Sequence, residues 1–142
     1  IVLEDREDFA KPELFPGARR TRLVDMEHLE EVCRDITSDD YICVMTRGHQ
    51  HDFLVEKQIL RTPASYIGVI GSRKKKEAVF AKLRQEGYTD QDLARIKTPM
   101  GLDIQAETPA EIAVSIAAEM IMERARRNHI ERPNEGGKEP CV

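Results

Sequence analysis

The chain has 142 residues, 40% of them hydrophobic and 34% charged, which fits one globular domain with a modest core. No apolar run approaches the roughly 20 residues of a membrane-spanning helix, and the acids from position 4 onward argue against a signal peptide. Residues 1–40 hold 12 acids and 6 bases, which leaves 14 of the 26 acids and 16 of the 22 bases for the rest. That nearly balanced remainder lacks the broad basic face that general nucleic-acid binding needs.

The first half of the chain alternates short apolar runs with segments of helical periodicity, a pattern that predicts parallel βαβ units. The expected strands are residues 1–3, 21–24 and 41–45. The last of these is nearly all apolar, as expected for a strand covered on both faces. Asp25 is placed to cap a first helix and Asp52 to cap a second, which ends near Leu60. The first helix carries an apolar stripe of Leu29, Val32, Cys33 and Ile36.

The second half predicts a buried strand at residues 65–70, followed by three helices. Each helix has a hydroxyl side chain placed to cap its N-terminus: Ser72, Thr89 and Thr108. In the last helix Glu111 completes a capping box and Pro109 stands at the first helical position. From about Arg132 the chain is rich in proline, glycine and charge, so we expect a flexible tail.

Three cysteines stand far apart, at positions 33, 43 and 141. Cys33 and Cys43 fall at apolar positions of a predicted helix and strand, which favours buried free thiols over a disulfide. Free thiols are typical of a reducing compartment, and we therefore expect a cytoplasmic protein. Cys141 lies in the tail, where nothing nearby would activate it.

The end of the first strand is one candidate site, because ligands of open parallel sheets bind beyond the carboxyl ends of strands. Glu4 and Asp5 stand there. In dinucleotide-binding folds an acid at that position hydrogen-bonds ribose hydroxyls. Arg6, Glu7 and Asp8 continue the charge, as in a solvated run, and the sequence leaves both interpretations open.

A second candidate follows the strand at 41–45 and contains Thr46, Arg47, Gly48, His49, His51 and Asp52. Gly48 permits a tight turn, and two imidazoles and a carboxylate reach one edge of the sheet. Proton transfer, anion binding and metal ligation through the His-x-His spacing stay open. Asp52 is expected to be a helix cap first and a ligand second, and simple exposure is the alternative for His51.

A third candidate is Gly71–Ser72–Arg73–Lys74, between a strand and a helix. The first turn of a helix offers unpaired N–H groups and about half a positive charge, and Gly71 permits close backbone approach. A solvated basic turn is the alternative, but cations at a helix N-terminus oppose the dipole by roughly 0.3–1 kcal/mol each. The segment therefore predicts a phosphate site, although it lacks the spacing of a Walker loop.

Taken together, these segments resemble the C-terminal Rossmann-like domain of the XdhC/CoxI family, the accessory factors of xanthine dehydrogenase and related molybdenum hydroxylases. The segments Ile-Gly-Ser-Arg-Lys, Gly-Leu-Asp-Ile and Thr-Pro-x-Glu-Ile-Ala-Val are specific to this resemblance. The matching stretches span nearly the whole chain: residues 2–6 with 15–16, 46–49 with Asp52, 66–74, and 99–104 with 108–116. The resemblance implies a three-layer α/β fold with a mostly parallel sheet over residues 1–131, followed by a tail at 132–142.

The resemblance also implies a function. Family members bind molybdenum cofactor, protect it during sulfuration and pass it to the apo-enzyme, so we expect a cofactor-binding chaperone more than a catalyst, and no catalytic residue is identified. The expected partners are a molybdenum hydroxylase apo-enzyme and, as a further candidate, a cysteine desulfurase. The phosphate of molybdopterin, or the diphosphate of its dinucleotide form, would suit residues 71–74. Carried over onto this sequence, the crevice would be lined by Thr46, His49, Asp52, Gly71, Ser72, Arg73, Gly101 and Asp103.

The sequence departs from the family pattern in two respects. It lacks the separate N-terminal domain with its cysteine-containing motif, and it lacks the opening strand and glycine-rich turn of the Rossmann domain. In the strand order 3-2-1-4-5 that strand is central, so the strands at 1–4 and 41–46 would share no neighbour and would each expose an edge. We expect a fragment of a longer chain, and a homodimer partner that supplies the strand is the alternative.

Three other functions stay open. An NAD(P)-dependent oxidoreductase would suit the fold, but the sequence has neither the glycine fingerprint nor an evident catalytic pair. A metal-dependent hydrolase would use His49, His51 and Asp52, although we expect no stoichiometric zinc. A docking domain with a degenerate site would bind its partner proteins without a cofactor.

Overall fold

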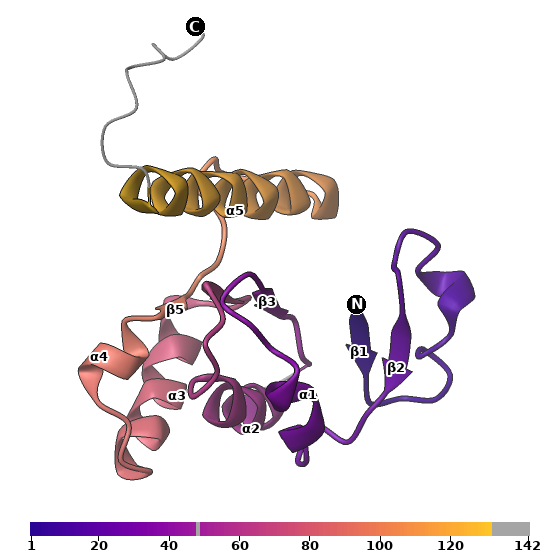
Figure 1. The fold of residues 1–142 in the computed structure, drawn as a ribbon, viewed down its shortest axis with the longest axis horizontal. Helices are drawn as coiled ribbons and strands as arrows, with labels where there is room; N and C mark the ends of the chain where they lie inside the picture. Colours follow the sequence, from indigo (N-terminus) through magenta and orange to yellow (C-terminus); the bar gives the residue numbers. More distant parts are fainter. Residues whose placement is uncertain (48, 132–142) are drawn as a thin grey trace, which may run out of the picture. The chain divides into compact units, whose positions relative to one another are not determined.

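The computed structural model describes residues 1–47 and 49–131 of the chain, which divide into two compact units, Ile1–Pro99 and the residues from Met100 onward. The strands of the first unit are β1 (Val2–Glu4), β2 (Thr21–Leu23), β3 (Tyr41–Val44), β4 (Tyr66–Val69) and β5 (Ile96–Lys97) (Figure 1). Its helices are the 3-10 helix η1 (Pro12–Leu14) and the α-helices α1 (Glu30–Arg34), α2 (His49–Ile59), α3 (Arg73–Gln85) and α4 (Asp90–Leu93). The second unit contains α5 (Pro109–Glu131).

All strand pairings among the described residues are parallel, as predicted, but the strands form two sheets. β1 pairs with β2, and the order in the second sheet is β3-β4-β5. The prediction that the strands at 1–4 and 41–46 share no neighbour is therefore confirmed for the described strands. The sequence does not predict β5, whose two residues pair with Ile67 and Gly68 of β4.

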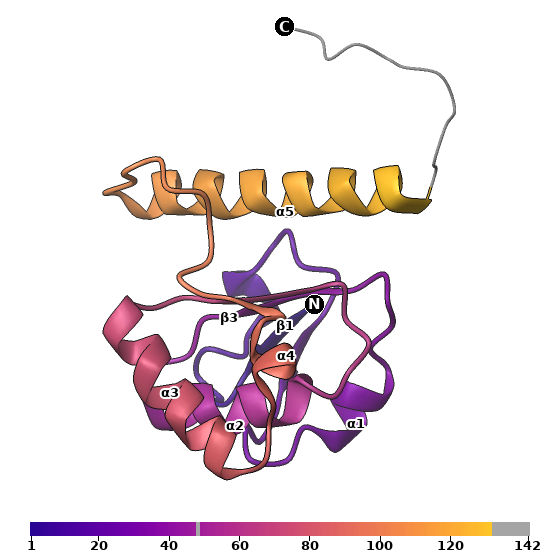
Figure 2. The same cartoon turned by 90° about the vertical axis from the view of Figure 1, so that its left-hand side faces the viewer.

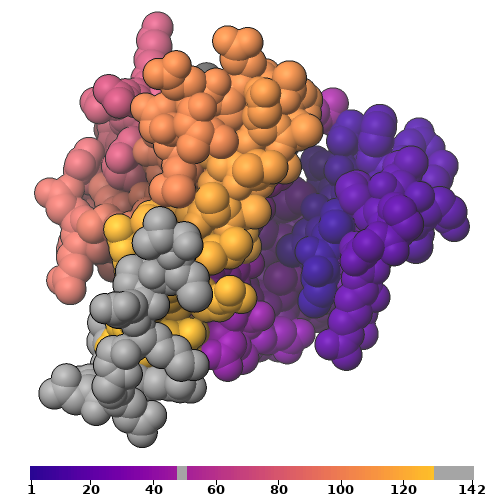
Figure 3. All heavy atoms as spheres, turned by 90° about the horizontal axis from the view of Figure 1, so that it is seen from above, coloured from indigo at the N-terminus to yellow at the C-terminus, as the bar shows by residue number. Residues whose placement is uncertain are grey.

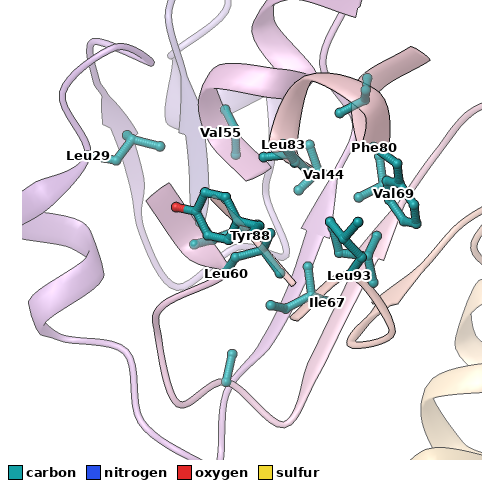
Figure 4. Close-up of a cluster of buried hydrophobic side chains, with 14 residues drawn as sticks. Leu29, Val44, Val55, Leu60, Ile67, Val69, Phe80, Leu83, Tyr88 and Leu93 are labelled. Carbon is teal, nitrogen blue, oxygen red and sulfur yellow. The ribbon is translucent and has the colours of Figure 1, made fainter. Parts of the chain in front are cut away.

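The core of the first unit lies between the three-stranded sheet and its helices. Helices α1, α2 and α3 lie on one side of that sheet, and α2 contacts α3 (Figure 1, Figure 2). The strands contribute Val44, Ile67 and Val69, and the labelled helical residues in Figure 4 include Val55, Phe80 and Leu83. The predicted α/β class with a parallel sheet is thus confirmed.

Helix starts follow local capping chemistry where a cap is present. Ser72 and Thr89 cap α3 and α4 as predicted. The predicted cap at Asp25 is wrong, because its carboxylate accepts from the backbone N–H of Glu27 at 2.9 Å and α1 begins only at Glu30. The predicted cap at Asp52 is wrong as well, since α2 begins at His49 and includes Asp52 in its first turn.

The expectation that the strand at 41–45 is covered on both faces is wrong for β3. Its Cys43 side chain is exposed and only Val44 is buried, whereas every residue of β4 is buried. β3 ends its sheet and pairs only with β4, so none of the described strands shields its other edge. The prediction of a buried thiol is therefore wrong for Cys43. Cys33 is half-buried, and burial raises the pKa of its thiol.

The second unit is dominated by α5, one side of which Figure 3 shows in orange to yellow. The predicted capping box is present: the Thr108 backbone N–H donates to the Glu111 carboxylate at 2.8 Å, and the Glu111 N–H donates to the Thr108 hydroxyl at 3.3 Å. Ile116 is buried, while Val114 and Ile121 are exposed. Among the described helices none is long and apolar enough to cross a membrane. The predicted tail, residues 132–142, and Cys141 lie outside the described residues.

Candidate functional site

A buried ion pair joins Asp52 of the second candidate segment to Lys75, the residue directly after the third. Asp52 of α2 is fully buried, and its Oδ1 accepts a hydrogen bond from the hydroxyl of Thr46, just beyond β3. Its Oδ2 lies against the ammonium group of Lys75, in the first turn of α3. The segments that follow β3 and β4 are therefore linked through side chains, although the sequence interpretation did not single out Lys75.

The turn from Gly71 to Lys75, called the α3 turn below, keeps donors for an anion. The Ser72 hydroxyl accepts from the backbone N–H of Lys75 at 3.3 Å, which fixes the turn. Within residues 1–47 and 49–131 no group accepts from the backbone N–H of Arg73 or Lys74, and both side chains are exposed. A Cβ on Gly71 would lie 2.9 Å from Cδ of Lys75, so the Lys75 side chain passes directly over Gly71.

Glu56 is a site residue that the sequence interpretation missed. It lies one helical turn after Asp52, is 2% exposed, and its Oε2 has no hydrogen-bond partner among the described residues. Burial, with a further contribution from the Asp52 charge, raises the pKa of Glu56 to about 7, and Lys75 acts in the opposite direction. The available signal was the i, i+3, i+4, i+7 stripe of Asp52, Val55, Glu56 and Ile59, which places both acids on the core-facing side of α2.

Asp52, Glu56 and Lys75, called the buried trio below, border a small cavity together with Ile70 and Thr98. Its volume of about 10 Å³ is enough for about one water molecule. Two carboxylates and one ammonium group thus share a space from which bulk water is excluded. In such surroundings a charge is costly unless it is paired, and the pairing of Lys75 decides which acid carries the charge.

A larger hollow lies beyond the ends of β1 and β2, and we call it the acidic hollow. Its volume is about 620 Å³. Its lining residues are Asp5, Glu7, Leu23, Val24, Asp25, Met26, Glu27 and His51. Four carboxylates would repel a phosphate, but they accept hydrogen bonds from hydroxyl or amino groups. Glu4 is not in this lining: Arg6 donates to its carboxylate at 2.7 Å, and this hydrogen bond lowers the pKa of Glu4.

The structure describes only some of the remaining residues of the second candidate segment. The Arg47 and His51 side chains are exposed, and His51 faces the acidic hollow although its neighbour Asp52 belongs to the buried trio. Gly48 and the side chain of His49 lie outside what the structure describes. In the part of the chain that it does describe, no group of three or more His, Cys, Asp or Glu side chains could hold a metal ion.

Gly101 and Asp103 belong to the second unit and are described apart from the α3 turn. Gly101 has a φ of +99°, and its N–H donates to Oε2 of Glu119 at 2.9 Å. The Ser115 hydroxyl donates to the carbonyl of Leu102 at 2.5 Å, and Asp103 is exposed. These bonds hold the segment before α5 against the helix itself, which gives Gly101 a structural role.

Gly101→Ala is expected to destabilise this segment by about 1–3 kcal/mol, because alanine combines an unfavourable positive φ with overpacking. The added Cβ would collide with Oγ of Ser115 and would lie 3.3 Å from the backbone nitrogen of Ile116. Urea unfolding followed by far-UV circular dichroism measures the loss. Gly17→Ala is the control, since a Cβ there meets nothing within 4 Å, and equal losses in the two variants would contradict the prediction.

Parallel strands whose carboxyl ends lead into helix N-termini define the class of this protein, a Rossmann-like α/β domain. The XdhC Rossmann domain family matches residues 1–120. The chain belongs to this family, and the resemblance seen in its motifs is confirmed.

Known relatives are longer than the chain. An uncharacterised protein of Escherichia coli strain K12, YqeB, is 32% identical over 112 residues, which make up 78% of this chain and 20% of that protein. A protein of Bacillus subtilis strain 168, described as a probable subunit of xanthine dehydrogenase, is 29% identical over 126 residues, 89% of this chain and 36% of that protein. The crystal structure of a xanthine dehydrogenase from Bacillus halodurans matches with a TM-score of 0.74 and 28% identity, over 93% of this chain and 37% of that one.

Proposed function

We propose that the chain binds the phosphate of molybdenum cofactor, or the diphosphate of its dinucleotide form, at the α3 turn. In this proposal it serves as an accessory factor in the maturation of a xanthine dehydrogenase-type molybdenum hydroxylase. Membership of the XdhC family and the xanthine dehydrogenase names of two similar proteins support the role. The single observation that carries the binding site is the Asp52–Lys75 ion pair, which links the segment after β3 to the α3 turn.

The residues present fit a phosphate. Arg73 and Lys74 supply backbone N–H groups without an acceptor among the described residues, at the positive end of a helix of 13 residues. Their exposed side chains add cations. The Oε2 of Glu56 lies in the cavity beside Lys75 and has no hydrogen-bond partner within the described chain. Buried polar atoms ordinarily have partners, and an exception of this kind is typical of a functional region. The cofactor supplies the molybdenum chemistry of the client enzyme, and the side chains named here hold it and orient it.

The acidic hollow favours a ligand with a nucleoside end. Its carboxylates accept hydrogen bonds from ribose hydroxyls, and His51 of α2 lies in its lining next in sequence to Asp52 of the buried trio. One ligand with a diphosphate and a nucleoside would use both regions. The same chemistry supports the second candidate function, an NAD(P)-binding domain, so the two must be separated by titration.

Arg73→Ala with Lys74→Ala is expected to weaken molybdopterin binding about tenfold or more, because each cation makes charge-assisted hydrogen bonds to phosphate. Pterin fluorescence or calorimetric titration measures the dissociation constant. The matched control removes two cations from the last turn of the same helix, Lys82→Ala with Arg84→Ala, and should leave the affinity within about twofold. Unchanged affinity in the first variant would remove the α3 turn as the site.

A parallel titration with NADH separates the two functions. The proposal expects molybdopterin or its dinucleotide form to bind more tightly than NADH. Binding of NADH alone would replace it with the oxidoreductase alternative. Capture of a molybdenum hydroxylase or a cysteine desulfurase by the protein with no bound pterin would favour a docking role. Sedimentation of the purified chain tests the alternative that a homodimer partner supplies the missing strand.

A further inference from the structure

The buried trio contains two acids but only one base. Asp52 is 0% and Glu56 2% exposed, and the one cation within the trio is Lys75, whose side chain is 15% exposed. Lys75 forms an ion pair with Asp52, which also accepts from Thr46, while Oε2 of Glu56 has neither an ion-pair nor a hydrogen-bond partner among residues 1–47 and 49–131. A proton on Glu56 removes the charge that has no partner, and the raised pKa of Glu56, about 7, agrees with this.

Lys75 belongs to both the buried trio and the α3 turn. Its backbone N–H is capped by Ser72, and its aliphatic chain passes over Gly71 toward Asp52. A side chain in a helix points toward the N-terminus, so Lys75 lies along the surface that an anion at the α3 turn would touch. Its ammonium group therefore has two possible partners, the buried Asp52 carboxylate and an anion beside Arg73 and Lys74.

We infer that an anion bound at the α3 turn draws the Lys75 ammonium group away from Asp52, and that Glu56 then takes up a proton from solvent. The inference rests on the proposed function, since it needs an anion at that turn. A proton from the buffered solvent adds to the Glu56 carboxylate, the Lys75–Asp52 ion pair opens, and no other covalent bond forms or breaks. Binding of the phosphorylated ligand and protonation of the buried acid then become one coupled equilibrium.

The direction of the coupling follows from the groups that face Glu56. From α2 the nearby charge is Asp52, which raises its pKa, and from α3 it is Lys75, which lowers it. Lys76 also borders the cavity, and its ammonium group lies 5.1 Å from the ring centre of Phe80. From the end of β5 only the uncharged Thr98 contributes to the lining. Withdrawal of Lys75 therefore raises the pKa of Glu56 further, and the bound state holds the proton more firmly than the free state.

Calorimetric titration with sulfate tests the coupling, because sulfate itself does not titrate near neutral pH. For the wild-type chain the dissociation constant is expected to rise roughly five- to tenfold between about pH 7 and pH 8.5, with proton uptake visible as a heat that depends on the buffer. In Glu56→Gln the side chain is permanently neutral, and the change over the same range should stay below about twofold. A wild-type constant independent of pH, or a dependence that persists in Glu56→Gln, would overturn the inference.

A second measurement does not need a ligand. Carboxyl carbon shifts recorded by NMR report the titration of Glu56, and Lys75→Met should move that titration to higher pH. An unmoved titration would overturn the inference even if sulfate binds. Failure of the proposed function looks different: sulfate binds with proton uptake but molybdopterin does not bind. If sulfate does not bind at all, neither the anion site nor the coupling exists.

Discussion

Asp52→Ala is expected to lower the free energy of unfolding by about 3 kcal/mol, because removal of one partner from a buried ion pair leaves the other without compensation. Asp52 is fully buried and holds both the Thr46 hydroxyl and the Lys75 ammonium group. This loss lies at the lower end of the range expected when a buried ion pair loses one partner, since the Lys75 side chain is 15% exposed and can turn toward water. Urea unfolding of the purified chain measures it.

The chain provides a matched exposed pair as a control. Lys57 and Glu86 approach to 2.5 Å, but their side chains are 42% and 43% exposed. Glu86→Ala should therefore cost less than about 1 kcal/mol. The double replacement Asp52→Leu with Lys75→Met should recover most of the Asp52→Ala loss, because an apolar pair of similar volume has no charge to desolvate. Equal losses for Asp52→Ala and Glu86→Ala would mean that the pair is not buried in solution.

Glu56→Gln is expected to change how stability depends on pH. The pKa of Glu56 is raised from 4.5 to about 7, so the folded state binds this proton more tightly than the unfolded state. The stabilisation from this group is fully present below about pH 4.5 and is lost as the pH rises through about 7. Relative to Glu56→Gln, the wild type should therefore lose about 3 kcal/mol between about pH 4.5 and pH 7.5.

The control for this pH series is a carboxylate shifted in the opposite direction. Hydrogen bonds from the backbone N–H groups of Thr108 and Glu107 lower the pKa of Glu111. Its stabilisation is present above the ordinary pKa of a glutamate and is lost as the pH falls, so Glu111→Gln should cost most at neutral pH. Urea unfolding at several pH values measures both variants. Parallel curves for wild type and Glu56→Gln would contradict the assignment of a raised pKa.

Features that depend on a few neighbouring residues are predictable from the sequence. Ser72 and the Thr108–Glu111 capping box fix helix starts through bonds within four residues, and the structure has them. The strand at 66–69 is evident because it is apolar and buried throughout. The separation of β1 from β3 is predictable because the family's strand order determines which strands can be neighbours.

Features that depend on distant partners are not predictable from local patterns. The sequence favours a capping role for Asp52 because its partner Lys75 is 23 positions away. The burial of Glu56 is not evident from the sequence, because a charged residue on a helix ordinarily faces water. The expected burial of Cys43 fails because an apolar strand does not reveal which of its faces is covered: Ile42 and Val44 face the core, and Cys43 points to the opposite side. The two residues of β5 are too few to form a detectable apolar run.

The two edge strands of the three-stranded sheet differ in length, which affects how a further strand could pair with each edge. β5 contributes two residues to the sheet, but β3 contributes four, all in register with β4. A main chain that adds to an open sheet gains hydrogen bonds in proportion to the length of the template. Among the described strands, the β3 edge is therefore the longer template for pairing with a further strand.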